Sequence, residues 1–79
     1  MGATTIQALF TALAAGLSIW EHKEARSYAN KLMNLRRNWH NEYNKKDRDD
    51  AVLDNIEFEL CLLCNGYSAE IEKQVAAPK

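Results

Sequence analysis

The stretch Asn44-Lys45-Lys46-Asp47-Arg48-Asp49-Asp50 contains only charged and amide side chains, and it lies between two runs patterned with apolar residues. Cations at the end of one helix and carboxylates at the start of the next both interact favourably with the helix dipoles. Asp49 or Asp50 can also cap the start of the second helix. The stretch therefore predicts a turn between two helices.

Upstream of this turn, apolar residues recur every three or four positions and are interrupted only at Glu24. They are Ile6, Phe10, Leu13, Leu17, Trp20, Tyr28, Leu32, Leu35, Trp39 and Tyr43. This spacing is typical of one helical stripe. Thr4 and Gln7 have the spacing of a capping box, and Gly16 permits a kink without requiring one. We therefore predict one helix from about Thr4 to Asn44, roughly 60 Å long.

Downstream of the turn, a second stripe consists of Leu53, Ile56, Leu60, Leu63 and Tyr67. Asn65-Gly66 is expected to end or kink this helix, and Ser68 would then start a short third helix through about Val75. Residues 76–79 resemble a flexible, frayed tail. A short turn makes its two helices antiparallel neighbours. The prediction is an all-α domain over residues 1–75, folded as an antiparallel hairpin with a long first helix.

The charge of the chain changes along its length. Residues 2–20 carry no charge, residues 21–48 carry 8 basic against 4 acidic groups, and residues 49–72 carry 7 acidic groups and no basic one. In the hairpin, the basic half of the long helix would lie against the acidic second helix. The net charge of −1, with acidic groups beside the basic ones, argues against binding of long nucleic acid.

A hairpin of this kind leaves residues 3–20 without a partner from the same chain, because the second helix covers only the C-terminal half of the first. Exposed apolar surface of that size indicates an interface. Val52, Phe58, Cys61 and Leu62 also widen the apolar surface of the second helix beyond one face. We predict interface residues on both helices: Ile6, Leu9, Phe10, Leu13, Leu17, Trp20, Phe58 and Leu62.

Two other arrangements would also cover residues 3–20. In the first, Gly2 to Trp20 crosses or enters a membrane, since its uncharged length is close to the ~20 residues that a span needs. Its threonines and its many alanines weigh against that alternative. In the second, the helix breaks near Gly16 and folds back to make a three-helix unit.

The candidates for chemistry are few. Cys61 and Cys64 have the spacing of half a zinc site, but two small residues packed on an apolar helix are the favoured interpretation, with metal binding or redox chemistry as lesser alternatives. His22 has carboxylates beside it, yet a helix spreads them over different faces, and no nucleophile is placed to partner it. We therefore predict no enzymatic activity, no metal and no cofactor.

Arg36 and Arg37 combine with Trp39 and Tyr43 into a mixture of cations and aromatic rings that can bind a phosphate or stack a base. One hypothesis is a small anionic ligand, such as a nucleotide, held by these residues between subunits. The alternative is that the two rings belong to the core and the arginines pair with Glu57 and Glu59 across the hairpin.

The stretches Ser18–Glu24 and Arg48–Leu60 resemble parts of short helical proteins of tailed bacteriophages and prophages. The resemblance implies a small accessory or virion protein of the bacterial cytoplasm, and it implies no functional residue. With the patterns above, it predicts a non-enzymatic interaction protein that oligomerises or docks into a larger assembly, as a virion component or an inhibitor. The alternatives are a membrane-active protein for lysis or genome delivery, acting through residues 3–20, and the small-ligand binder.

Overall fold

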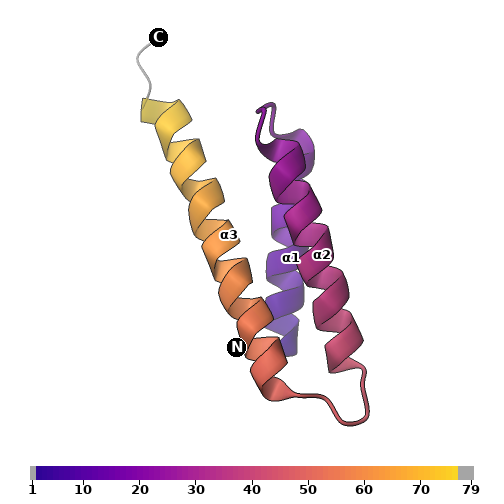
Figure 1. Cartoon of the computed structure of the whole chain (residues 1–79). Helices are drawn as coiled ribbons and strands as arrows, with labels where there is room; N and C mark the ends of the chain where they lie inside the picture. Colours follow the sequence, from indigo (N-terminus) through magenta and orange to yellow (C-terminus); the bar gives the residue numbers. More distant parts are fainter. Residues whose placement is uncertain (1, 77–79) are drawn as a thin grey trace.

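The computed structural model describes residues 2–76 and contains three helices: α1 (Ala3–Ile19), α2 (Ala25–Tyr43) and α3 (Asp50–Ala76). They run up, down and up beside one another, so that α2 is antiparallel to both of its neighbours (Figure 1). The bundle measures 53 × 18 × 18 Å. The all-α prediction is confirmed over the described residues, which contain no strand.

The prediction of one helix from Thr4 to Asn44 is wrong. The chain leaves the helix at Trp20 and re-enters it at Ala25, which places the break after Gly16 rather than at it. Folding back buries four large apolar side chains, each of which contributes about 1.5–3 kcal/mol: Ile6, Phe10, Leu13 and Leu17. That gain exceeds the loss of a few helical hydrogen bonds, each with a net value of about 1 kcal/mol.

Trp20 fixes the turn between α1 and α2. Its backbone is extended, with φ −83° and ψ 114°, and its indole packs edge-on against Tyr67 with ring centroids 4.9 Å apart. The indole Nε1 also donates a hydrogen bond to Gln74 Oε1 at 3.0 Å. These contacts with the far end of α3 hold the break in a segment that contains neither Gly nor Pro.

The predicted end of the second helix at Asn65-Gly66 is also wrong. Helix α3 continues to Ala76 and includes the segment from Ser68 to Val75 that was expected to be separate. Gly66 does not adopt a positive φ. Its missing side chain instead gives room to α2, because a Cβ at this position would lie 3.1 Å from Tyr28 Oη. Residues 77–79 of the predicted tail lie outside the described part of the chain.

The start of α3 agrees with the prediction, whereas the start of α1 differs from it. Asp49 precedes α3, and its Oδ1 accepts a hydrogen bond from the backbone N–H of Ala51 at 2.9 Å, which is the N-cap geometry. By contrast, α1 begins at Ala3 after Gly2 without a side-chain cap, so the capping box expected at Thr4 does not form.

The core runs along the axis of the bundle and takes side chains from all three helices. Phe10 of α1 and Trp39 of α2 pack against each other in this core with ring centroids 6.3 Å apart, and both are almost completely buried. The other buried apolar residues follow the stripes expected from the sequence: Ile6, Leu13, Leu17, Leu32, Leu35, Leu53, Ile56, Leu60 and Leu63.

Candidate interaction surface

The N-terminal half of the predicted interface is not a surface of the folded chain. Ile6, Phe10, Leu13 and Leu17 lie in the core, and Leu9 and Trp20 are half-buried against it. The premise that residues 3–20 lack cover from their own chain is therefore wrong, because α1 packs against α2 once the chain folds back. Over residues 2–76, every helix falls short of the length and apolarity that crossing a membrane requires.

The other two predicted interface residues do lie on the surface. Phe58 is 62% exposed and Leu62 is 54% exposed, and they are one helical turn apart on α3. Both belong to an exposed stripe of uncharged residues in which spacings of four and three alternate, as in a coiled-coil seam. We call this stripe the α3 face: Ala51, Asn55, Phe58, Leu62, Asn65 and Ala69.

Acidic side chains border the α3 face. Asp54 and Glu72 lie along one edge and Glu59 along the other, and all three are exposed. Within α3 the only basic residue is Lys73, whose Nζ lies 3.4 Å from Glu70 Oε1. The uncharged stripe, with Phe58 and Leu62 at its centre, therefore has acidic residues along both edges.

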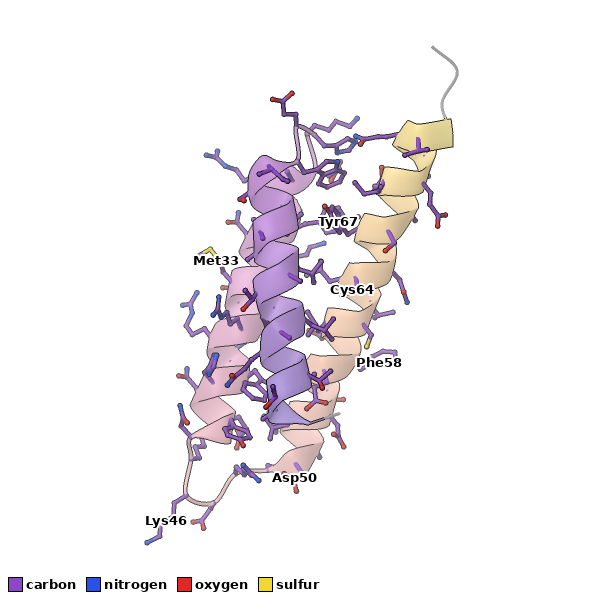
Figure 2. The ribbon with its side chains drawn as sticks, turned by 180° about the vertical axis from the view of Figure 1, so that it is seen from behind. Met33, Lys46, Asp50, Phe58, Cys64 and Tyr67 are labelled. Atoms are coloured by element: carbon purple, nitrogen blue, oxygen red, sulfur yellow. The ribbon has the colours of Figure 1, made fainter. Side chains whose placement is uncertain are left out.

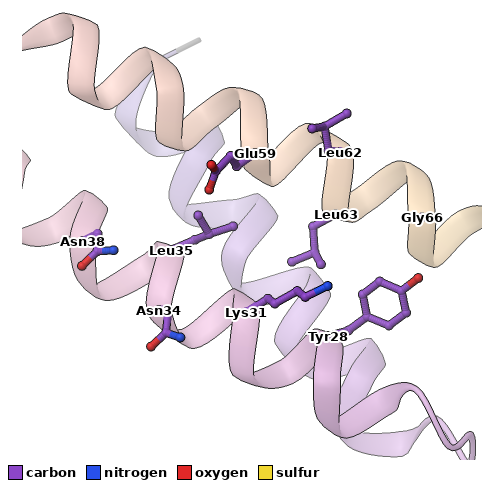
Figure 3. Close-up of a pocket in the computed structure, with 9 residues that line it drawn as sticks. All are labelled: Tyr28, Lys31, Asn34, Leu35, Asn38, Glu59, Leu62, Leu63 and Gly66. Atoms are coloured by element: carbon purple, nitrogen blue, oxygen red, sulfur yellow. The ribbon is translucent and has the colours of Figure 1, made fainter.

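A groove separates α3 from α2 beside Glu59 and Leu62 (Figure 3). Its volume is about 510 Å³. Figure 3 shows Leu62 pointing away from α2, whereas the Lys31 side chain extends along the groove toward Tyr28, with Nζ 6.0 Å from the centre of that ring. The lining combines amides, both signs of charge and leucines: Tyr28, Lys31, Asn34, Leu35, Asn38, Glu59, Leu62, Leu63 and Gly66. Leu62 of the α3 face and Glu59 at its edge thus also line the groove.

The outward surface of α2 has the opposite charge. Its exposed charged residues are all basic, namely Arg26, Lys31, Arg36 and Arg37. Met33 is 64% exposed among them. We call Arg26, Met33, Arg36 and Arg37 the α2 face. Figure 2 shows Met33 and Phe58 on opposite sides of the bundle.

The basic residues of α2 are not neutralised by α3. The ion pairs within residues 2–76 involve other groups: His22–Glu70, Lys45–Glu42, Arg48–Asp50 and Lys73–Glu70. The predicted pairing of Arg36 and Arg37 with Glu57 and Glu59 is not among them. Arg37 instead donates a hydrogen bond to Asn34 of its own helix at 2.9 Å. The sequence did not indicate this basic face, because a hairpin would have turned it toward the acidic helix.

The predicted ligand site around Arg36, Arg37, Trp39 and Tyr43 does not assemble. Trp39 is 1% exposed and lies in the core, whereas both arginines point to solvent. Tyr43 stacks on Trp39 with ring centroids 4.7 Å apart. Arg48 of the turn lies over the Tyr43 ring at 4.6 Å. The cation that contacts the Trp39–Tyr43 pair is therefore Arg48, which the sequence had placed only in the turn.

His22 makes contacts with the turn between α1 and α2 and with α3. Its ring stacks on Trp20 with centroids 4.4 Å apart, and its Nδ1 accepts a hydrogen bond from the backbone N–H of Glu24 at 3.0 Å. Its Nε2 lies 3.9 Å from Glu70 Oε2 on α3. These contacts join the turn between α1 and α2 to the end of α3.

The two cysteines are free thiols, both half-buried. Burial raises the pKa of the Cys64 thiol, and neighbouring Cys61 raises it further. A raised pKa keeps the thiol protonated and therefore poorly nucleophilic at neutral pH. Among residues 2–76, no three His, Cys, Asp or Glu side chains gather as metal ligands would.

Glu42 is the one buried charged residue of the described chain. Its Oε2 accepts a hydrogen bond from the backbone N–H of Asp49 at 2.9 Å, and its Oε1 accepts one from Lys45 Nζ at 3.1 Å. The Asp49 N–H, and then the Lys45 ammonium, hold the pKa of Glu42 below its ordinary value of 4.5. Glu42 therefore ties the end of α2 to the start of α3.

Comparison with protein families, with curated proteins and with solved structures finds no match for the chain.

Proposed function

We propose that this chain is a non-enzymatic helical binding protein whose docking surface is the α3 face, and that its partner presents a cationic amphipathic helix. The observation that carries the proposal is the exposure of Phe58 and Leu62, at 62% and 54%, on a helix whose opposite side is already buried. Among the described residues, six large apolar side chains are exposed. Phe58 and Leu62 lie one helical turn apart on the same side of α3, so this pair suggests a contact surface.

The chemistry of the partner follows from the border of the α3 face. Leucine-like side chains of a second helix can pack between Phe58 and Leu62, as in helix-in-groove recognition. Lysines or arginines beside them would meet Asp54, Glu59 and Glu72. Such charge complementarity adds mainly association rate and specificity, whereas the apolar contact supplies most of the affinity. Of the interface predicted on both helices, only the part on α3, Phe58 and Leu62, belongs to this docking surface.

The biological setting stays a prediction. The bacteriophage or prophage origin implied by the sequence resemblance would make the partner a virion protein or a bacterial host protein. The α3 face is the proposed docking surface in either case.

An NMR titration tests the proposed docking surface. The probe is a synthetic helical peptide of leucine and lysine in heptad spacing, added to dilute ¹⁵N-labelled protein. We expect amide shifts along the α3 face, and none on the exposed side of α1. A peptide with glutamate in place of lysine should bind more weakly.

The matched control keeps every charge and removes the apolar contact by Phe58→Ala with Leu62→Ala. The proposal predicts that this variant loses the binding. Unchanged binding would show that the peptide recognises charge alone, and shifts centred on another helix would show that the α3 face is not the docking surface.

A further inference from the structure

The proposed docking surface leaves open which cationic helix occupies it. We propose that the occupant is the α2 face of a second copy of this chain, so that copies associate head to tail. The inference rests on the proposed function, since it names a partner for the same surface.

Helix α2 presents an exposed apolar side chain among exposed basic residues, which is what the α3 face requires of a partner. Met33 is 64% exposed, and Arg26 and Arg37 lie seven residues before it and four after it, on the same side of the helix. The only acidic residue of α2, Glu42, is buried. The arginines of the α2 face take part in none of the ion pairs found within residues 2–76. An apolar centre with unneutralised cations around it complements an uncharged stripe with acidic residues along both edges.

Pairing of two α3 faces with each other is less favourable. If Phe58 of one copy packs on Leu62 of another in an antiparallel pair, both Glu59 carboxylates lie at the same edge of the interface and at nearly the same height. Like charges placed directly opposite each other are destabilising. If Arg26 or Arg37 of the α2 face lies opposite Glu59 instead, the charges attract each other.

The positions of the two faces determine the form of the assembly. Met33 and Phe58 lie on opposite sides of the bundle (Figure 2), so a chain cannot satisfy its own faces. When one copy uses its α3 face, its α2 face stays open for a third copy. Such heterologous contacts produce rings if the rotation closes and open chains if it does not.

The contact is expected to be weak. Stable interfaces bury about 800 Å² on each partner, and one helix crossing another through three apolar side chains covers less than that. Association should therefore appear only at high concentration. It should weaken as salt screens exposed charges, for which the screening length is about 8 Å at physiological ionic strength.

The test uses two surface variants of the full chain. Phe58→Glu with Leu62→Glu removes the α3 face and keeps the α2 face, whereas Met33→Glu with Arg37→Glu does the reverse. All four positions are exposed, and circular dichroism checks that both variants keep the fold. Mass in solution is measured by light scattering and sedimentation, from micromolar to millimolar concentration.

We expect the wild-type mass to rise with concentration beyond that of a dimer and to fall when salt is added. Each variant alone should stay a monomer. The equimolar mixture should form a heterodimer and nothing larger, because each variant contributes its one intact face.

Three results would overturn the inference. They are a wild-type chain that stays monomeric at millimolar concentration, a Met33→Glu/Arg37→Glu variant that still dimerises alone through paired α3 faces, and a mixture that contains only monomers. If the wild type stays monomeric but the leucine–lysine peptide binds along the α3 face, the self-association fails and the proposed function survives. If neither occurs, both fail.

Discussion

Gly16 and Gly66 each face the hydroxyl group of a tyrosine on another helix. A Cβ at Gly16 would lie 2.9 Å from Tyr67 Oη, and one at Gly66 would lie 3.1 Å from Tyr28 Oη. A helical glycine costs about 1 kcal/mol relative to alanine. At both positions that cost is offset by room for a tyrosine ring that packs against Trp20.

Replacing Gly16 with alanine should therefore have different effects in two backgrounds. In a Tyr67→Phe chain the hydroxyl is gone, and we expect Gly16→Ala to raise the free energy of unfolding by up to about 1 kcal/mol through helix propensity. In the wild-type chain the gain should be smaller or reversed. Urea unfolding measures both, with Ala12→Gly on the exposed side of α1 as the control. Equal effects of Gly16→Ala in the two backgrounds would show that Tyr67 does not select the glycine.

Glu42 should make the stability of the bundle depend on pH. Because its pKa is lower in the folded chain than its ordinary value of 4.5, its contribution is fully present above that value and is lost as the pH falls toward the folded pKa. We expect Glu42→Gln to lower the urea midpoint at pH 7 and to reduce the further loss on acidification. The control is Glu21→Gln, at an exposed position of the first turn. A variant that keeps the full acid dependence would assign it to other carboxylates.

At the scale of the elements, the turn at residues 20–24 depends on one aromatic side chain. We expect Trp20→Ala to lower the free energy of unfolding by about 2 kcal/mol, below the ~3–5 kcal/mol of a fully buried tryptophan, because the indole is half-buried. Trp20→Phe should keep most of the stability. Unfolding is followed by the fluorescence of Trp39, which lies in the core. Ile19→Ala, at a position 82% exposed, is the control and should change stability by less than about 0.5 kcal/mol.

The sequence predicted the interior of each helix better than its ends. The apolar stripes identified the core positions, since a period near 3.6 residues determines which side of a helix is buried. A three-helix unit with a break near Gly16 was only an alternative to the single long helix, and the position of the break at Trp20 was missed because no Gly or Pro marks it. The contacts that hold the break come from Tyr67 and Gln74, about fifty residues away in the chain. The continuation of α3 through Gly66 was missed for the same reason. The glycine makes room for Tyr28, a residue of another helix that lies far away in the sequence.

For the surface, the sequence located Phe58 and Leu62 correctly as exposed residues, because they fall outside the α3 core stripe. It placed Ile6 to Leu17 wrongly, since their exposure depended on where the first helix ended. The α2 face was not identified. Its arginines were expected to pair with α3, and only the arrangement of all three helices turns them outward.

At the scale of the whole molecule, all three helices should be needed for cooperative folding. Trp39 packs against Phe10 of α1, so removing residues 2–20 uncovers the largest side chain of the core. We expect the shortened chain to lose its cooperative urea transition and much of its helical circular dichroism signal. Thr11→Ala, on the exposed side of α1, should leave the transition unchanged. A shortened chain that unfolds cooperatively at the wild-type midpoint would show that α2 and α3 form an independent hairpin.

The separation of charge by helix also has a consequence for how the molecule behaves on a charged resin. Helix α1 carries no charge, the exposed charged residues of α2 are all basic, and α3 carries acidic residues on its outer side. A chain with a net charge of −1 and evenly mixed charges would pass through ion-exchange columns near neutral pH. This bundle should instead be retained at low salt by both a cation exchanger and an anion exchanger, binding through opposite sides. Arg36→Gln with Arg37→Gln should abolish retention on the first column and strengthen it on the second.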